Sequence, residues 1–86
     1  MATIIDEQHA ISALQEAGEK LNPADGEAVL DFSSVRRVDS SMLRALEEFA
    51  RVAEQKVVKV VLRGVNVDVY KVLKLVKLTR RFSFAS

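Results

Sequence analysis

The feature that most constrains the fold is an alternation of two kinds of segment along the chain. Short apolar runs are separated by longer segments whose apolar residues recur at helical spacing. The expected strands are ATII near the N-terminus, residues 27–32, residues 57–63 and FSF near the C-terminus. The expected helices span residues 6–21, residues 40–54 and a third segment that Asn66 or Asp68 caps and that ends near Leu75. This β-α-β-α-β-α-β order with short connections predicts an α/β layered domain with a short, mainly parallel sheet of about four strands.

Length and composition predict one small domain over residues 1–86 with an aliphatic core. Hydrophobic residues make up 49% of the chain, but aromatic residues only 6%, and tryptophan is absent. A domain of this size has little interior, so its core must be well filled. The periodicity, together with the family resemblance described below, predicts a core built by Leu30, Phe32, Leu43, Leu46, Phe49, Val58, Val60, Leu62, Val69, Leu73 and Phe82.

Several kinds of catalytic and metal site lack the residues they need. The chain has no cysteine, which excludes disulfides, thiolate zinc sites and a cysteine nucleophile. His9 is the one histidine, so we expect no conventional zinc site. The three glycines are far apart in the sequence and form no phosphate-binding loop. Asp31 and Asp39 flank one loop, and we interpret them as a strand end and a helix cap. We therefore expect a protein that is not an enzyme and carries no cofactor or metal.

The N-terminus and the most apolar run bear on the cellular location. The N-terminus has no basic segment followed by a long apolar run, so it does not resemble a signal peptide. The most apolar run, VVKVVL, is short and contains Lys59, which predicts a buried strand rather than a membrane span. A cytoplasmic location fits both observations.

The charges are unevenly distributed along the chain. Residues 1–35 hold seven acids and one base, whereas residues 36–86 hold five acids and twelve bases. Folding either neutralises these halves against each other or displays an acidic and a basic face.

The basic C-terminal segment has two interpretations. Lys71, Lys74, Lys77 and Arg80 or Arg81 recur about every three residues, as in a stripe that binds anionic lipid or nucleic acid. More often such a stripe is the solvated face of a helix. On that interpretation, the residues that pack inward are Val72, Leu75, Val76 and Leu78. Aromatic residues are not interleaved for base stacking, so nucleic-acid binding is the less favoured outcome.

Two serines open the second expected helix, in the stretch VDSSMLRALEEF. Serine is a favoured N-cap, because its hydroxyl accepts a hydrogen bond from a free helix N–H. On composition alone, a structural cap is therefore sufficient explanation for Ser40 and Ser41.

A wider pattern adds a functional interpretation. The stretches AVLDFSS, VDSS, VVKVVLRGV and VYKVLKLVKLTRRF follow one another in this order between Ala28 and Phe82. In order and spacing they resemble a STAS domain, the module of sulphate transporters and anti-sigma factor antagonists. That family has a strand ending in an acidic turn, then DSSG at the start of a helix, then a second strand and a further helix.

The resemblance implies a switchable binding module. In antagonists of this family, the partner anti-sigma kinase phosphorylates the first serine of DSS, which matches Ser40 here. The unmodified protein binds the kinase and frees the sigma factor. The resemblance and the positions near Ser40 together imply a partner-binding set made up of Asp39, Ser40, Ser41, Met42, Leu43, Arg36, Arg37 and Arg44. The arginines are candidates to pair with a phosphate or with acids of the partner.

Two departures from the family pattern leave alternatives open. Met42 stands where the family has glycine, and it is expected to offer a flexible apolar contact. This favours a non-phosphorylated subunit that scaffolds a transporter or a stressosome-like assembly. The family's N-terminal hairpin is reduced to ATIID, which leaves a sheet edge or face for a dimer mate or another partner. A small enzyme or a nucleotide-binding domain is a third possibility, which no catalytic constellation supports.

Overall fold

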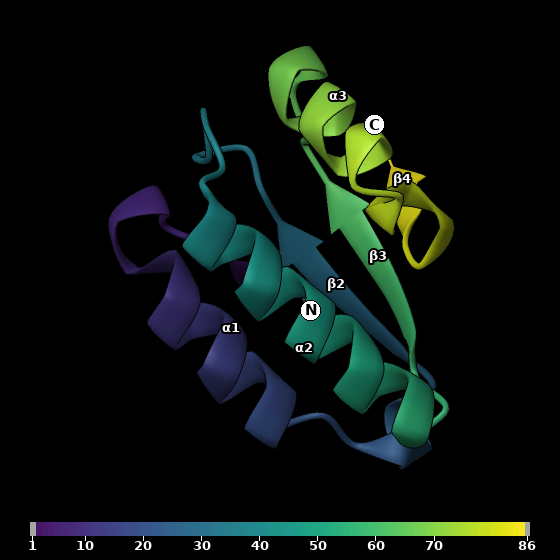
Figure 1. Ribbon diagram of the computed structural model, residues 1–86. Coiled ribbons are helices and arrows are strands. Elements are labelled where there is room, and N and C mark those ends of the chain that lie inside the picture. Colours follow the sequence, from purple (N-terminus) through teal and green to yellow (C-terminus); the bar gives the residue numbers. More distant parts are fainter. Residues whose placement is uncertain (1, 86) are drawn as a thin grey trace.

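The computed structural model describes residues 2–85 and follows the expected order of elements (Figure 1). Its strands are β1 (Ala2–Ile4), β2 (Glu27–Asp31), β3 (Lys59–Arg63) and β4 (Ser83–Ala85). Its helices are α1 (Ala10–Glu19), α2 (Ser40–Gln55) and α3 (Val67–Leu75), with 3-10 turns η1 (Glu7–His9), η2 (Pro23–Asp25) and η3 (Leu78–Arg80). The strands form one sheet in the order β1-β2-β3-β4, and every neighbouring pair is parallel. The predicted α/β fold with a parallel four-stranded sheet is therefore confirmed.

All three helices pack on the same face of the sheet. Neighbouring strands are parallel and follow chain order, so right-handed crossovers place each connecting helix on the same side. Helices α1 and α2 lie next to each other across this face (Figure 1). Helix α3 contacts it near β4, where the rings of Tyr70 and Phe84 meet edge to face with centroids 5.1 Å apart. Phe84 is in register with Leu62, which in turn is in register with Leu30.

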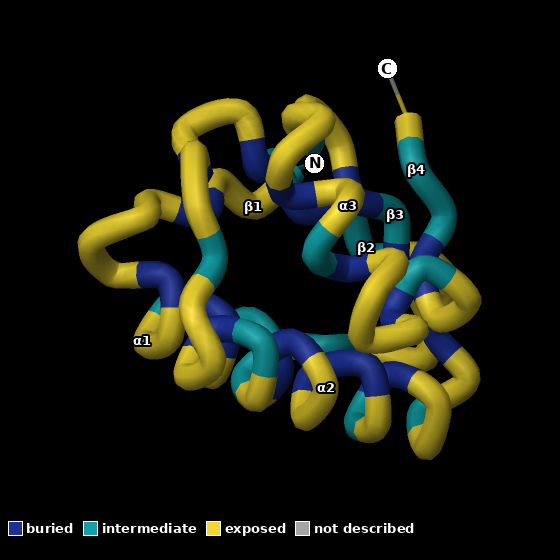
Figure 2. The backbone as a smooth tube through the Cα atoms, turned by 45° about the horizontal axis from the view of Figure 1, so that its top comes forward, coloured by how far each residue is buried: buried dark blue, intermediate teal, exposed yellow. Residues whose placement is uncertain are grey.

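The core lies between this sheet face and the helices, and Figure 2 shows the buried side of α2 turned toward the strands. Ten of the eleven residues predicted for the core are buried, and Leu43 is half-buried at its margin. The sequence prediction omitted other buried residues, which are Ile5, Ala10, Leu14, Val35, Met42, Ala50, Ala53 and Leu78.

The opposite sheet face is uncovered by helices, in contrast to most parallel sheets, which are buried on both faces. Val29 and Val61 are in register on this face and are only half-buried. Charged residues flank them, with Asp31 opposite Arg63 and Glu27 opposite Lys59 in the same register. The strands that looked almost continuously apolar therefore bury one face only.

Two boundaries differ from the sequence prediction for identifiable reasons. Helix α1 begins at Ala10, because residues 7–9 form the tighter turn η1. Strand β3 begins at Lys59 instead of Val57, because the end of α2 turns back on itself. There the Val58 N–H donates to the Ala53 carbonyl at 2.8 Å and the Val57 N–H donates to the Glu54 carbonyl at 3.1 Å. These two bonds define a Schellman ending, with Val57 at its left-handed position (φ 57°).

Side chains near the ends of α2 and α3 also correct the sequence analysis. Arg51 pairs with Glu48, three residues earlier in α2. Leu75 and Val76 were expected to pack inward, but they are 82% and 41% exposed. Asn66 is the N-cap of α3, as one of the two predicted alternatives proposed, since its side chain accepts the Val69 N–H at 2.8 Å.

Candidate functional site

The carboxyl ends of β1, β2 and β3 meet at one edge of the sheet, at the top of Figure 1. In open parallel sheets, this edge is where binding sites usually form. The segment after β1 carries Glu7, the long loop after β2 spans residues 32–39, and the turn after β3 leads to Asn66. Because the three segments lie together, side chains from one can fix the backbone of another.

Glu7 fixes the middle of the 32–39 loop. One of its carboxylate oxygens accepts the backbone N–H of Arg36 at 2.7 Å and that of Arg37 at 2.9 Å. These bonds hold the pKa of the Glu7 carboxyl below its usual range, with the bond from Arg37 contributing most. The two arginines are therefore held through their backbone, which leaves the guanidinium groups free to reach outward.

Asn66 holds the same loop from the other side. Its amide nitrogen donates to the carbonyl oxygens of Val35 at 3.2 Å and Arg36 at 3.3 Å. Val35 is buried (1% exposed) and anchors the loop to the core. Since the oxygen of the same side chain caps α3, Asn66 joins the start of α3 to the loop that precedes α2.

A third cluster fixes the start of the loop. The Asp31 carboxylate accepts the Ser33 hydroxyl at 2.6 Å, the Ser33 N–H at 2.9 Å and the Arg63 guanidinium at 3.2 Å. These hydrogen bonds lower the pKa of Asp31 to about 2, with the Ser33 hydroxyl contributing most. The backbone of Gly64 lies close to Ser33. A Cβ added to Gly64 would lie 3.0 Å from the Ser33 Cβ and 3.1 Å from the Ser33 nitrogen.

Asp39, not a serine, caps α2. Its carboxylate accepts the Met42 N–H at 2.8 Å, and its carbonyl accepts the Leu43 N–H at 3.0 Å. Ser40 and Ser41 are the first two residues of the helix, and both are exposed. The interpretation of Asp39 as a helix cap is confirmed, and the interpretation of the serines as the cap is wrong. The Ser40 hydroxyl therefore does not cap the helix, so a capping role does not account for a serine at this position.

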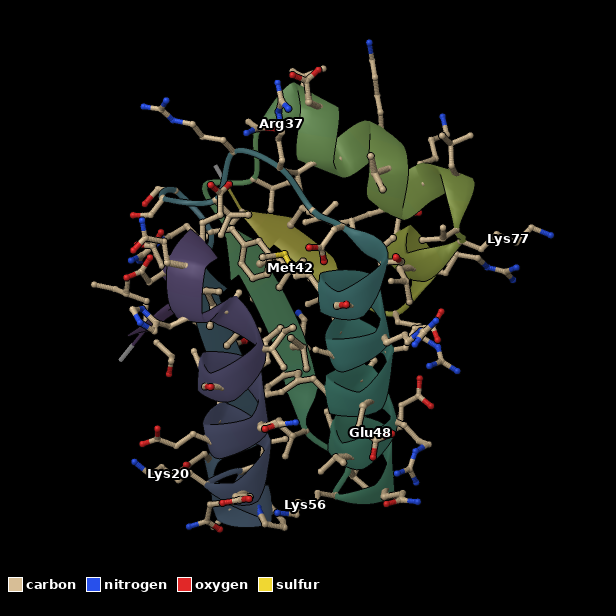
Figure 3. The ribbon with its side chains drawn as sticks, turned by 60° about the vertical axis from the view of Figure 1, so that its left-hand side comes forward. Lys20, Arg37, Met42, Glu48, Lys56 and Lys77 are labelled. Atoms are coloured by element: carbon tan, nitrogen blue, oxygen red, sulfur yellow. The ribbon has the colours of Figure 1, made fainter. Side chains whose placement is uncertain are left out.

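Met42 does not provide the exposed apolar contact that the sequence suggested. It is 4% exposed and points between α1 and α2 (Figure 3). Leu43 is half-buried. The helix geometry explains the difference, because Met42 lies one turn before Leu46 and shares its inward face. A methionine at this position therefore fills the core.

The remaining expected partner-binding residues lie at the surface. Arg36, Arg37 and Arg44 are exposed, and Figure 3 shows Arg37 at the top of the view. No acidic side chain within residues 2–85 forms a salt bridge with any of these three arginines. A shallow hollow of about 240 Å³ borders the same region, and its lining includes His9, Ile11 and Asp39. The surface around the start of α2 thus combines two hydroxyls, three cations and a small recess.

Two residues that hold the 32–39 loop in place were not predicted from the sequence to do so. Glu7 is not among the predicted site residues, and Asn66 is predicted only as a possible cap. Their contacts with the loop join residues about 30 positions apart, and no local pattern signals them. Within residues 2–85, no group of three or more His, Cys, Asp or Glu side chains is placed to hold a metal ion.

Comparison with known families decides which family the chain belongs to. The family described as "Mlab, STAS domain" matches residues 4–83, which is nearly the whole chain. The chain belongs to the STAS domain family. Comparison of this STAS domain with curated proteins gives no match. No helix in the described part of the chain is long and apolar enough to cross a membrane.

A solved structure supports the fold. This STAS domain is similar to a crystal structure from Thermotoga maritima, described as that of a candidate anti-sigma factor antagonist, with a TM-score of 0.75. The match covers 98% of this chain and 74% of that one, at 18% sequence identity. At this identity the likeness establishes the shared fold.

Proposed function

We propose that this STAS domain acts as a regulator by binding a protein partner, such as an anti-sigma kinase, and that phosphorylation of Ser40 breaks the complex. The observation that carries the proposal is the placement of Ser40. It is exposed in the first turn of α2, while Asp39 supplies the cap. A change at the Ser40 hydroxyl therefore leaves the hydrogen bonds of the helix start intact.

The electrostatics of the helix start suit such a switch. A phosphate adds a charge of about −1.5 to −2, and the amino end of a helix stabilises negative charge. Arg36, Arg37 and Arg44 supply unpaired cations nearby in the sequence. The fold then tolerates the phosphate, whereas a partner that presents acidic residues to the same arginines is repelled. We propose a binding surface that comprises Asp39, Ser40, Ser41, Leu43, Arg36, Arg37 and Arg44, with Met42 supporting it from beneath.

A second function rests on Met42. The family glycine at this position is replaced by a buried side chain, so the start of α2 is packed differently. This favours a subunit that binds a transporter or a stressosome-like assembly constitutively. In that case Ser40 is not modified, and the same surface binds its partner at all times.

One experiment separates the two functions. Wild type, Ser40→Ala, Ser40→Asp and Ser41→Asp serve as baits in extract of the native cells, and bound proteins are identified by mass spectrometry. Ser41→Asp adds the same charge at a second, equally exposed residue of the proposed surface, so it tests whether the loss is specific to Ser40. For the switch, we expect an anti-sigma kinase on wild type and Ser40→Ala, and its loss on Ser40→Asp.

The native protein is examined in parallel for phosphate on Ser40. If all four baits retain one transporter or scaffold partner and Ser40 carries no phosphate, the switch is wrong and constitutive assembly is supported. If Ser41→Asp loses the partner as fully as Ser40→Asp, the effect is general repulsion and Ser40 has no special role.

A further inference from the structure

A separate surface on α3 and η3 combines unpaired cations with exposed aliphatic side chains. We call it the α3 basic surface, and it comprises Lys71, Lys74, Leu75, Lys77 and Arg80, all exposed. Lys71, Lys74 and Leu75 lie within one turn of α3 and share its outer side. Lys77 follows in a left-handed conformation (φ 64°), and Figure 3 shows its side chain extending away from the molecule.

The aliphatic part of this surface is not required by the core. Val69 and Leu73 are 1% and 0% exposed and provide the packing of α3, whereas Leu75 is 82% exposed. Val67 lies on the same outer side and is 68% exposed. The expectation that Leu75 packs inward would have made the lysine stripe a solvated helix face. Its exposure leaves an apolar side chain flanked by cations, which that explanation does not account for.

The four cations of this surface also have no acidic partner in the described part of the chain. Within residues 2–85, none of the four forms a salt bridge, and the neighbouring Arg81 pairs with Glu54 at 3.5 Å. Asp68 is the one acid on α3, and it lies in the first turn, at the opposite end of the helix from Lys74 and Leu75. The C-terminal half of α3 and the turn after it therefore present positive charge to whatever approaches.

We propose that the α3 basic surface docks on anionic lipid headgroups, with Leu75 inserting between them. Cations around an exposed aliphatic side chain complement a membrane surface, because the charges meet the headgroups while the apolar group reaches the acyl boundary. Nucleic acid fits less well, since Tyr70, the aromatic residue of α3, packs edge to face against Phe84. A second copy is disfavoured because two such surfaces repel each other.

The test is cosedimentation of the full chain with vesicles of phosphatidylcholine alone or with added phosphatidylglycerol. We expect binding to the anionic vesicles only, and its loss at high salt. Each of Lys71→Gln and Lys74→Gln is expected to weaken binding about fivefold. Leu75→Ser is expected to weaken it about tenfold while the charge stays the same. All three positions are exposed, so thermal unfolding should confirm that the variants remain folded.

Two matched controls lie elsewhere on the molecule. Lys59→Gln removes one exposed cation from the uncovered sheet face, and Val57→Ser removes an aliphatic side chain that is 84% exposed. Both should bind anionic vesicles as wild type does. The proposal is overturned if phosphatidylcholine vesicles bind equally well, or if Lys59→Gln weakens binding as much as Lys71→Gln. It is also overturned if duplex DNA or RNA is bound at the same salt while anionic vesicles are not.

Discussion

Four residues adopt left-handed backbone conformations in the described part of the chain, and these conformations are unfavourable for residues other than glycine. Val57 and Lys77 are the non-glycine residues with positive φ, and Gly26 and Gly64 adopt similar angles. Glycine adopts this region freely, whereas a β-branched residue is disfavoured there. Val57 therefore completes the Schellman ending of α2 at an energetic cost, and a side chain at Gly64 would crowd Ser33.

Replacing Val57 by glycine should stabilise the protein. The side chain is 84% exposed and contributes little packing, so its loss costs little. Relief of the left-handed strain is expected to add about 1 kcal/mol, which would raise the melting temperature by about 4–8 °C in a domain of this size. Val67→Gly is the control, because Val67 is also exposed but has an ordinary helical conformation. Thermal unfolding that places Val57→Gly below wild type would contradict the strain argument.

Replacing Gly64 by alanine should destabilise the protein by about 1–3 kcal/mol. The new Cβ would meet the Ser33 Cβ at 3.0 Å and backbone atoms of Ser33 at 3.1 and 3.2 Å. Gly26→Ala isolates the steric part, because Gly26 has a similar φ of 71° and nothing within 4 Å of the added atom. Urea unfolding of both variants measures the difference. Equal losses would show that the close approach to Ser33 costs nothing.

At the scale of elements, the fold uses the connections after β1 and β3 to shape the connection after β2. Glu7 and Asn66 come from different segments, and both bind the backbone between Val35 and Arg37. A similar contact joins the ends of α1 and α2. There the Lys56 ammonium, just after α2, donates to the Leu21 carbonyl, just after α1, at 3.0 Å. The 32–39 loop and the end of α1 are therefore each held by residues from other segments.

Replacing Glu7 by alanine should loosen the loop that leads to Ser40. The N–H groups of Arg36 and Arg37 lose their shared acceptor, so we expect their hydrogen exchange to become at least several-fold faster. Asp25→Ala is the control, since it removes an exposed acid on η2, far along the chain from this loop. Exchange rates of the two amides that stay unchanged in Glu7→Ala would mean that Asn66 and Val35 alone hold the loop.

At the scale of the whole molecule, hydrogen bonds to Asp31 make the stability of the fold depend on pH. The uncovered face carries the Asp31–Arg63 pair between β2 and β3, just before the 32–39 loop. The pKa of Asp31 is lowered to about 2 from an ordinary value of 3.8. A group with a lowered pKa stabilises the fold at pH values above its ordinary pKa, and this contribution fades as the pH falls through its lowered pKa.

Asp31→Asn should therefore be less stable than wild type at pH 5, and this difference should shrink between pH 4 and pH 2. Urea unfolding of both proteins across this range gives the comparison. Asp25→Asn, which removes an exposed acid on η2 away from this pair, serves as the control. A wild-type advantage that stays constant down to pH 2 would show that the carboxylate charge of Asp31 does not contribute.

The sequence by itself determined the order of elements, the parallel sheet and most of the core. Each depends on local periodicity, and a helical or alternating pattern is present in the chain before it folds. It also located the start of α2 as the candidate site, because DSS is a contiguous motif.

Only the tertiary structure decided how that site is built. It showed that Asp39 and not a serine caps the helix, that Met42 faces the core, that Glu7 and Asn66 hold the loop, and that Leu75 is exposed. Whether an apolar residue on a helix is buried depends on what packs against it. Whether a carboxylate meets a distant N–H depends on how segments 30 residues apart come together, which no local pattern contains.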